Sequence, residues 1–305
     1  MLCSADLDKL KLDEDFKKVS DMSNVVSINP NEQAVIYLKI IDLAGNYVYV
    51  SSKGYVADSQ KSSITIDPQD YYKKIGDGDN ATYIYNKNNQ NDDGKYNLKV
   101  KVKEPEAEKD SSFAGIKAVS YRILVDDKGN EPVILYNFDN TNPSKEDLKD
   151  EWSGTISVDA SENNSSNVVV EVTATDNAGN TTIKKVKLDI DITNPDILVS
   201  YDNNKDNNGN KYFNANREAT VSIKERTNHF DEKAATEGIK ITAVDAKGEK
   251  VLSEKQIKAM ISNWTTIEGT KPDEAIHSAT ISYTADANYT FKVGYTDEVL
   301  SLIHI

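Results

Sequence analysis

The sequence predicts an all-β protein made of tandem β-sandwiches with short inserted helices. From Val168 to Thr175 an apolar residue occupies at least every second position, which is the period of a half-buried strand. The next five residues, Asp176–Asn180 (D-N-A-G-N), can reverse the chain, because Asp176 can form an Asx turn and Gly179 can take a positive φ without a Cβ clash. A second apolar run then returns at 186–190. These features predict an antiparallel hairpin at the edge of a core.

The same construction occurs at Asp42 (D-L-A-G-N) and, nearly, at Asp297. The positions two and four before each aspartate are apolar in all three copies: Ile40 and Leu38, Ala174 and Val172, Tyr295 and Val293. We interpret this as an internal repeat. We therefore expect Ile40, Val172 and Val293 each to point into a core.

The D-x-A-G-N hairpin resembles the penultimate strand and last hairpin of the immunoglobulin-like domains found in bacterial, mainly Gram-positive, surface proteins. The resemblance implies tandem immunoglobulin-like β-sandwiches in a secreted or wall-attached bacterial protein. It implies a non-enzymatic stalk that adheres to, or presents a domain to, a host or cell-surface protein or glycan.

Bulk composition agrees with small sandwiches. The 305 residues allow two or three domains, and 38% hydrophobic and 8% aromatic residues suit thin cores better than one large core. A net charge of −14 disfavours nucleic acid as a partner, because phosphate binding needs clustered Lys and Arg. The single cysteine, Cys3, allows no internal disulfide, which suits a Gram-positive exoprotein. No apolar run approaches the roughly 20 residues that cross a bilayer, so we expect no membrane insertion.

Residues 1–61 are expected to be the C-terminal remnant of one domain. A short helix is predicted over Leu12–Val19 and a strand over Val25–Ile28, before the hairpin at Asp42. In the resembling family a hairpin followed by V-x-D leads out to the next module, and Val56-Ala57-Asp58 has that form. This places the first boundary near Ser62.

Residues 62–191 are expected to form a complete domain. It opens with a strand at 64–68, continues with a strong strand whose one face carries Tyr96, Leu98, Val100 and Val102, and then a strand from Gly115. Ser144 and Asp147 predict a capped helix that leads to Trp152, ahead of a strand with Ile156 and Val158. The hairpin at Asp176 closes this unit.

Residues 192–299 are expected to repeat that order after a linker at Asn194-Pro195, without the last strand. A strand is predicted around Val221 and Ile223, another from Gly238, and a helix capped by Ser253 and Gln256 that leads to Trp264. Four markers recur in one order at nearly constant spacing, namely Gly115 and Gly238, Val125 and Val244, Trp152 and Trp264, Asp176 and Asp297.

The last six residues, 300–305 (L-S-L-I-H-I), resemble the translation of a sequencing-library adapter, so we exclude them as an artefact. With the first unit lacking its front and the third its last strand, we expect an internal fragment of a longer protein.

No catalytic, cofactor or metal site is predicted. The tract Asp202–Asn210 has the spaced oxygens of a calcium loop, but with Asn204 as position one, position twelve is Ala215 instead of Glu. We interpret it as a hairpin tip. His229 and His277 have no catalytic partner nearby in sequence and are interpreted as surface or edge residues.

Two further features bear on function. Trp152 and Trp264 either stack on a sugar or on an aromatic group of a partner, or they pack a short helix onto the sandwich, and we favour the packing role. Some modules of the resembling family cross-link a buried Lys to an Asn, and Lys99 and Lys101 lie on a predicted strand, but the sequence selects no pair.

Two functions from different classes remain open. The first is the stalk described above. The alternative is that these are accessory modules of a large extracellular hydrolase acting on glycans or peptides, whose catalytic domain lies outside the fragment. A weaker third possibility is carbohydrate binding by the loops themselves.

Overall fold

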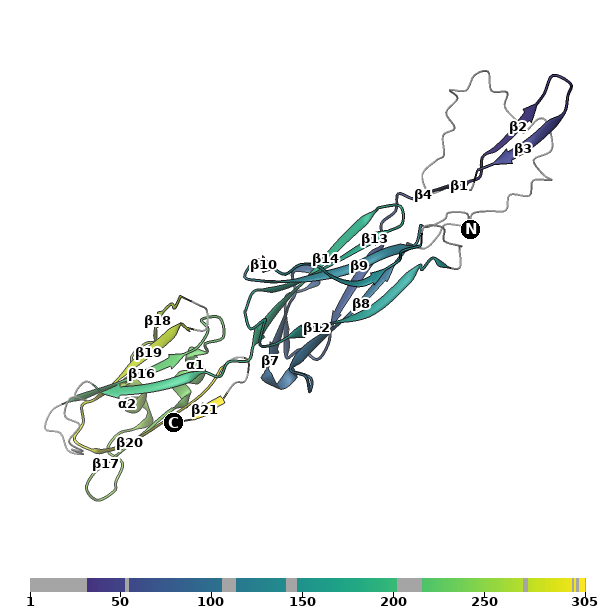
Figure 1. Cartoon of the computed structure of the whole chain (residues 1–305). Coiled ribbons are helices and arrows are strands. Elements are labelled where there is room, and N and C mark those ends of the chain that lie inside the picture. Colours follow the sequence, from purple (N-terminus) through teal and green to yellow (C-terminus); the bar gives the residue numbers. More distant parts are fainter. Residues whose placement is uncertain are drawn as a thin grey trace. The chain divides into compact units, whose positions relative to one another are not determined.

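The computed structural model describes residues 32–52, 55–105, 114–140, 147–201, 216–270, 274–297, 299 and 302–304 (Figure 1). The predictions for Leu12–Val19, Val25–Ile28 and Asp202–Asn210 lie outside this part of the chain. Strands dominate the described residues, and the two α-helices among them are seven and six residues long. The all-β prediction is therefore confirmed. No described helix has the length and apolar character needed to span a bilayer.

The strands follow the chain in this order. They are β1 (Glu32–Ala34), β2 (Tyr37–Ile41), β3 (Tyr47–Ser51), β4 (Tyr55–Ala57), β5 (Ser63–Pro68), β6 (Lys73–Ile75), β7 (Thr82–Asn86), β8 (Lys95–Lys103), β9 (Ile116–Val125), β10 (Lys128–Gly129) and β11 (Val133–Asn137). They continue with β12 (Glu151–Asp159), β13 (Val168–Asp176), β14 (Thr181–Asp191), β15 (Asp196–Tyr201), β16 (Arg217–Lys224), β17 (Ile239–Val244), β18 (Thr265–Ile267), β19 (Ile276–Tyr283), β20 (Asn288–Thr296) and β21 (Leu302–His304). The helices are α1 (Glu232–Gly238) and α2 (Glu254–Ala259).

The chain divides into two compact units. The first comprises Met1–Gln69, Asn97–Ser157 and Val169–Lys187, and the second comprises Asp70–Tyr96, Val158–Val168 and Leu188–Ile305. The predicted boundaries at 62, 192 and 300 are not tested by this division and stay predictions. The immunoglobulin-like assignment likewise stays a prediction.

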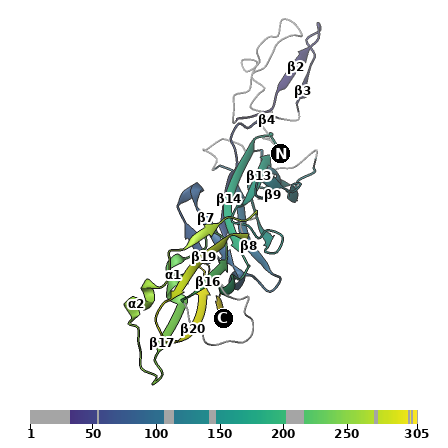
Figure 2. The ribbon, with the colours of Figure 1, turned by 90° about the vertical axis from the view of Figure 1, so that its left-hand side faces the viewer.

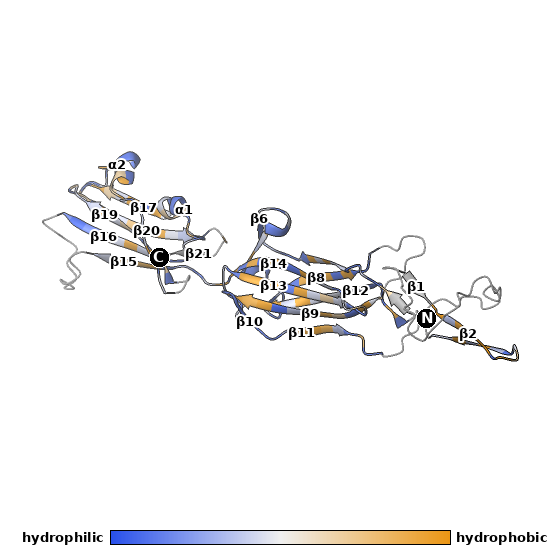
Figure 3. Ribbon diagram, turned by 90° about the horizontal axis from the view of Figure 1, so that it is seen from above, coloured by the Kyte–Doolittle hydropathy of each residue, from blue (hydrophilic) through white to orange (hydrophobic). Residues whose placement is uncertain are grey.

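Two sheets contain the strands from β5 to β14. One has the order β10-β9-β13-β14-β7-β6, with β11 paired to β9, and the other has the order β12-β8-β5. The alternation predicted from sequence is confirmed on β8, where Tyr96, Leu98, Val100 and Val102 are all buried, and on β13, where Val172 and Ala174 are fully buried. Figure 3 shows hydrophobic residues along β9 and β13.

The expectation for Ile40 is wrong. Ile40 and Leu38 are 50% and 47% exposed, although the counterparts of Ile40 (Ala174 and Tyr295) and of Leu38 (Val172 and Val293) are buried. The cause is that β2 and β3 form a two-stranded sheet by themselves among the described residues, and a lone hairpin has no second layer to cover an apolar face.

The hairpin turns form as the sequence predicts. Gly45 and Gly179 both have positive φ, of 87° and 95°. In the second hairpin, Asn180 donates from its backbone N to Asp176 Oδ1 (2.8 Å) and from its side-chain Nδ2 to Asp176 Oδ2 (2.8 Å). Asn46 makes the same two bonds to Asp42. The aspartate and the asparagine four residues later therefore hold the turn together from both ends.

The strands after residue 195 form a two-layer sandwich. One sheet has the order β15-β16-β19-β18 and the other the order β17-β20-β21. Buried residues of both sheets share one core cluster, which consists of Ile197, Ala219, Val221, Ile223, Ala235, Ile239, Ile241, Ile281, Val293 and Tyr295. Helix α1 lies against β17 and β20, near α2 in the view of Figure 2.

Helix predictions were partly right. The capping box of Ser253 and Gln256 is present at the start of α2, as predicted. Trp152 lies on β12, where its period-two alternation with Ile156 and Val158 favours a strand. Ser144, the predicted start of the helix before it, lies outside the described residues. Helix α1, capped by the Asp231 side chain, was not predicted.

Leu302–His304, which sequence analysis excluded as an artefact, forms β21 and pairs with Gly294–Thr296 of β20. Strand pairing uses backbone groups, so an extended segment of almost any sequence can occupy such an edge. The artefact interpretation is not tested by this pairing and stays a prediction.

Candidate functional site

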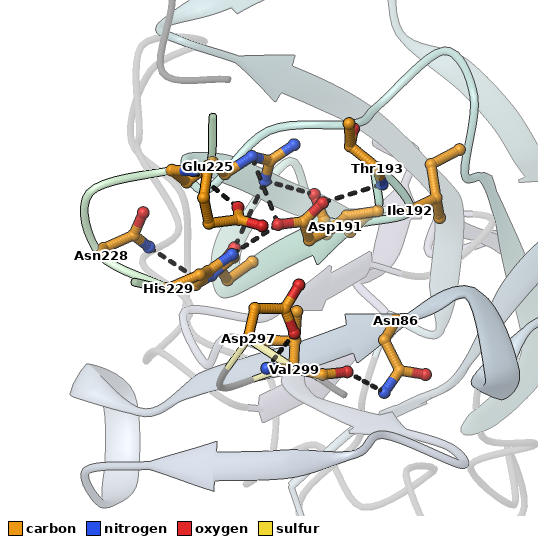
Figure 4. Close-up of polar contacts among 12 residues, drawn as sticks. Asn86, Asp191, Ile192, Thr193, Glu225, Asn228, His229, Asp297 and Val299 are labelled. Atoms are coloured by element: carbon orange, nitrogen blue, oxygen red, sulfur yellow. Dashed lines mark hydrogen bonds and ion pairs between the residues drawn. The ribbon is translucent and has the colours of Figure 1, made fainter. Parts of the chain in front are cut away.

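The most concentrated group of buried charged side chains lies at one end of β14. Asp189 and Asp191 are among its last residues, Glu225 and Arg226 directly follow β16, and His229 lies in the turn before α1 (Figure 4). We call these five residues the buried ionic cluster. Each of them is at most 6% exposed.

Local backbone structure explains how the cluster assembles. The last four residues of β14 are all buried, so both faces of that strand end are covered and both aspartates are removed from water. On the other side, the backbone N–H groups of His229 and Phe230 both donate to the carbonyl oxygen of Arg226 (3.0 Å each), and this tight turn brings residues 226 and 229 to the same place.

Arg226 is the central donor. Its Nη1 donates to the carbonyl oxygen of Ile190 (2.7 Å) and its Nη2 to Oδ1 of Asn164 (2.6 Å). Its Nε lies 3.5 Å from Asp191 Oδ2, and its Nη1 lies 3.8 Å from Asp189 Oδ1. The guanidinium thus lies beside both aspartates and supplies one of the two positive charges that balance them, while two of its N–H groups donate to neutral oxygens.

His229 binds both aspartates. Its Nδ1 lies 2.5 Å from Asp191 Oδ2 and its Nε2 lies 2.9 Å from Asp189 Oδ2. Burial alone would lower the pKa of His229, but hydrogen bonds to Asp189 and Asp191 and their charges outweigh burial and raise the pKa to about 9. The imidazole is therefore a cation at neutral pH and donates from both nitrogens.

Glu225 completes the cluster. Its Oε1 accepts from the backbone N of Arg226 (2.6 Å). Burial, followed by the nearby charges of Asp191 and Asp297, raises the pKa of Glu225 to about 8. Burial and these charges therefore favour the protonated form of Glu225.

Ligand atoms of Asp191, Glu225 and His229 lie within 4.8 Å of one another, a spacing that can hold a metal ion. The imidazole does not fit this role, because both of its nitrogens are committed to carboxylates and it has no lone pair to offer. The exposure is also too low for a substrate to reach the cluster. Its chemistry is that of a structural ion network.

The sequence interpretation of the two histidines as surface residues is wrong. His229 and His277 are 2% and 1% exposed. His277 bonds Oγ1 of Thr266 through Nδ1 (2.8 Å) and the carbonyl oxygen of Glu225 through Nε2 (3.1 Å), and its ring stacks on Phe230 with centroids 3.9 Å apart. Burial lowers the pKa of His277. Both histidines are thus buried and bonded to neighbouring groups of the protein.

The other candidates lie apart from this cluster. Trp264 packs on the core cluster of the sandwich formed after residue 195, and its Nε1 donates to Thr236 Oγ1 (2.9 Å). These contacts agree with the packing role. Trp152 is half-buried, with its ring 6.5 Å from that of Tyr136. Lys99 and Lys101 are exposed, and Lys101 pairs with Glu151 at 2.7 Å, so neither is the buried lysine of a cross-link.

Sequence reasoning did not identify the buried ionic cluster. Asp189 and Asp191 are separated by 38 or more residues from their partner His229, so no local spacing joins them. The available signal was the pair of aspartates on one strand end together with the R-x-x-H of 226–229.

No family model and no curated protein matches this chain. One similar solved structure is described as a tetra-tandem repeat in the extending region of a large adhesion protein. It is 15% identical with a TM-score of 0.39, and the match covers 90% of this chain and 55% of that chain. This chain thus spans about half the length of that structure.

Proposed function

We propose that this chain is a non-enzymatic segment of a bacterial surface protein, in which tandem immunoglobulin-like sandwiches space or present a binding domain outside the cell. The observation that carries the proposal is the core cluster of residues 197–295, whose ten buried members all come from one stretch of sequence. A stretch that closes its own core can be repeated along a chain without altering its neighbours.

Two further observations support a structural role. The sequence markers recur in order through the second and third predicted units. Within the described residues, the histidines that could serve catalysis are buried and bonded to structural partners.

Single-molecule force spectroscopy on the full chain, held by handles at both termini, tests the proposal. Independent sandwiches predict at least two separate unfolding events. Each would release a contour length of roughly 40 nm, because an extended residue spans about 3.3–3.6 Å. One event that released all of the folded residues together would contradict the proposal.

Hydrolysis of glycan or peptide libraries by the purified chain would also overturn it. The alternative function, an accessory module of an extracellular hydrolase, predicts no activity from this chain but a catalytic domain in the adjoining reading frame. Sequencing of that frame distinguishes the two functions.

A further inference from the structure

A second group of carboxylates lies in the compact unit that comprises Met1–Gln69, Asn97–Ser157 and Val169–Lys187. Asp58 is in the segment between β4 and β5, Glu104 follows β8, and Asp176 ends β13. One ligand atom from each of these three side chains lies within 4.8 Å of the others. Glu104 is 2% exposed and Asp176 is fully buried. We call these residues the acidic triad.

The triad is built on a fixed backbone framework. Asp58 accepts from the backbone N of Gln60 (2.9 Å) and of Ala114 (2.8 Å). Asn180 bonds Asp176 and also donates from Nδ2 to the carbonyl oxygen of Asp58 (3.0 Å). These bonds hold two of the carboxylates in place with no cation.

One oxygen of the triad has no partner. Ser62 Oγ donates to Glu104 Oε1 (2.8 Å), whereas Glu104 Oε2 is buried and accepts no hydrogen bond from the residues that the structure describes. Burial, together with the charges of Asp176 and Asp58, raises the pKa of Glu104 to about 7. A buried carboxylate oxygen without a donor is costly, so this site is incomplete as it stands.

The internal repeat contains a second copy of this arrangement, in which Glu225 Oε2 is likewise buried without a hydrogen-bond donor among the described residues. Glu104 directly follows β8 and Glu225 directly follows β16. Each glutamate ends a similar stretch, V-K-V-K-E at 100–104 and V-S-I-K-E at 221–225. Glu104 and Glu225 are separated by the same number of residues as Asp176 and Asp297. Asp58 and Asp191 stand equally far before β5 and β15. Asp191, Glu225 and Asp297 are therefore the second copy of the triad.

In the second copy, two positively charged side chains of the protein lie beside the carboxylates. The Arg226 guanidinium and the His229 imidazolium lie against Asp191, at 3.5 Å and 2.5 Å. In the first copy the residue after Glu104 is Pro105, and no Lys, Arg or His of the described residues forms an ion pair with the triad. The two copies thus share acidic residues but differ in their source of positive charge.

We propose that Asp58, Glu104 and Asp176 bind one divalent cation of the calcium class, at the place that Arg226 and His229 fill in the second copy. All donors of the triad are oxygen, which favours a hard cation over zinc or copper. Three carboxylates leave coordination positions for carbonyl oxygens and water, as calcium accepts. This inference does not depend on the proposed function.

Calorimetric titration of the full chain with CaCl₂, after removal of metals with EDTA, tests the proposal. Wild type should bind one Ca²⁺ per chain, because the second copy is already neutralised. At a hundredfold excess over Kd, the ion should raise the Tm by about 5 °C or more relative to EDTA. MgCl₂ titrated in parallel should bind more weakly, because it demands near-ideal octahedral geometry.

Glu104→Gln should weaken Ca²⁺ binding at least tenfold, whereas the matched control Glu225→Gln, at the equivalent position of the second copy, should leave affinity and stoichiometry unchanged. Asp58→Asn serves as the second variant if Glu104→Gln does not fold in EDTA. Absence of Ca²⁺ binding at millimolar concentration, a stoichiometry of two, or loss of binding in Glu225→Gln would each overturn the proposal.

Discussion

Arg226 donates from Nη1 to the carbonyl oxygen of Ile190 at 2.7 Å, with its side chain only 1% exposed. The bond ties the turn after β16 to the last residues of β14. It matters because the same guanidinium also lies beside two buried aspartates, whose charges it balances together with His229.

Arg226→Met should therefore destabilise the protein strongly. Removal of one partner of a buried ion network leaves uncompensated charges and costs about 3 to 5 kcal/mol. Urea denaturation of the full chain measures the loss. Lys101→Met is the control, since its pair with Glu151 is solvent-exposed on both sides and should contribute less than about 1 kcal/mol. Equal losses in the two variants would contradict the assigned role of Arg226.

Above pH 6.5 stability should fall as the pH rises, because the opposite effect of His277, whose pKa is lowered from 6.5, is complete there. The pKa of Glu225 rises from 4.5 to about 8 in the folded protein, and that of His229 from 6.5 to about 9. Both groups then bind a proton more tightly when folded. The stabilisation by His229 is complete below pH 6.5 and is lost through pH 9, and that linked to Glu225 is lost between pH 4.5 and 8.

The groups that face these two residues are Asp189, Asp191, Asp297 and Arg226. Each titrating group contributes a slope of at most roughly 1.4 kcal/mol per pH unit. Urea denaturation in EDTA at pH 5 to 9 checks this expectation. His229→Asn should flatten the upper part of the profile and Glu225→Gln the lower part. A stability that increases from pH 6 to 8 would show that the linkage is wrong.

The two hairpin turns should differ in their sensitivity to mutation. Asn180→Ala removes bonds to Asp176 and to the carbonyl oxygen of Asp58 in a partly buried site and should cost about 1 to 3 kcal/mol. Asn46→Ala removes the equivalent bond to Asp42 on an exposed hairpin and should leave global unfolding unchanged. Chemical denaturation of both variants provides the comparison, and a larger effect at Asn46 would be inconsistent with it.

Gly238 should tolerate no side chain. A Cβ at this position would lie 1.8 Å from the carbonyl oxygen of Gly294, a backbone atom that cannot rotate away. Gly238→Ala should cost about 3 kcal/mol or prevent folding. Gly248→Ala is the control, because its position is open and only its φ of +85° is unfavourable, which costs about 1 kcal/mol. Thermal unfolding followed by circular dichroism measures both, and similar melting temperatures would refute the close approach.

The strands could be predicted because their signal is local. On β8 and β13 every second residue is apolar, and one buried face is enough to select the strand conformation. The turns were predictable for a similar reason, since Asp176 and Asn180 bond within one five-residue stretch.

Two features differ from the sequence-based expectation, namely helix α1 and the exposed face around Ile40. Helix α1 has an N-cap, Asp231, and good helix formers, but Gly238 was interpreted only as the start of a strand. The exposed face around Ile40 could not be predicted, because its sequence matches the buried copies, whereas no layer among the described residues covers it.

The paired carboxylates of the two copies were visible in the sequence as recurring V-x-x-K-E stretches, yet their proximity was not. Glu104 and Asp176 meet only after the sheets form. The contacts between buried charged residues are therefore the main feature that the sequence alone does not predict.

The uncovered hairpin of β2 and β3 has a dynamic consequence. Among the described residues no apolar layer shields the ladder bonds over Tyr37–Ile41 and Tyr47–Ser51, and side chains such as Leu38 and Val50 are about half accessible. Amide protons of this ribbon should exchange with deuterated solvent well before those of β8 or β13, through openings that never disturb the sandwiches.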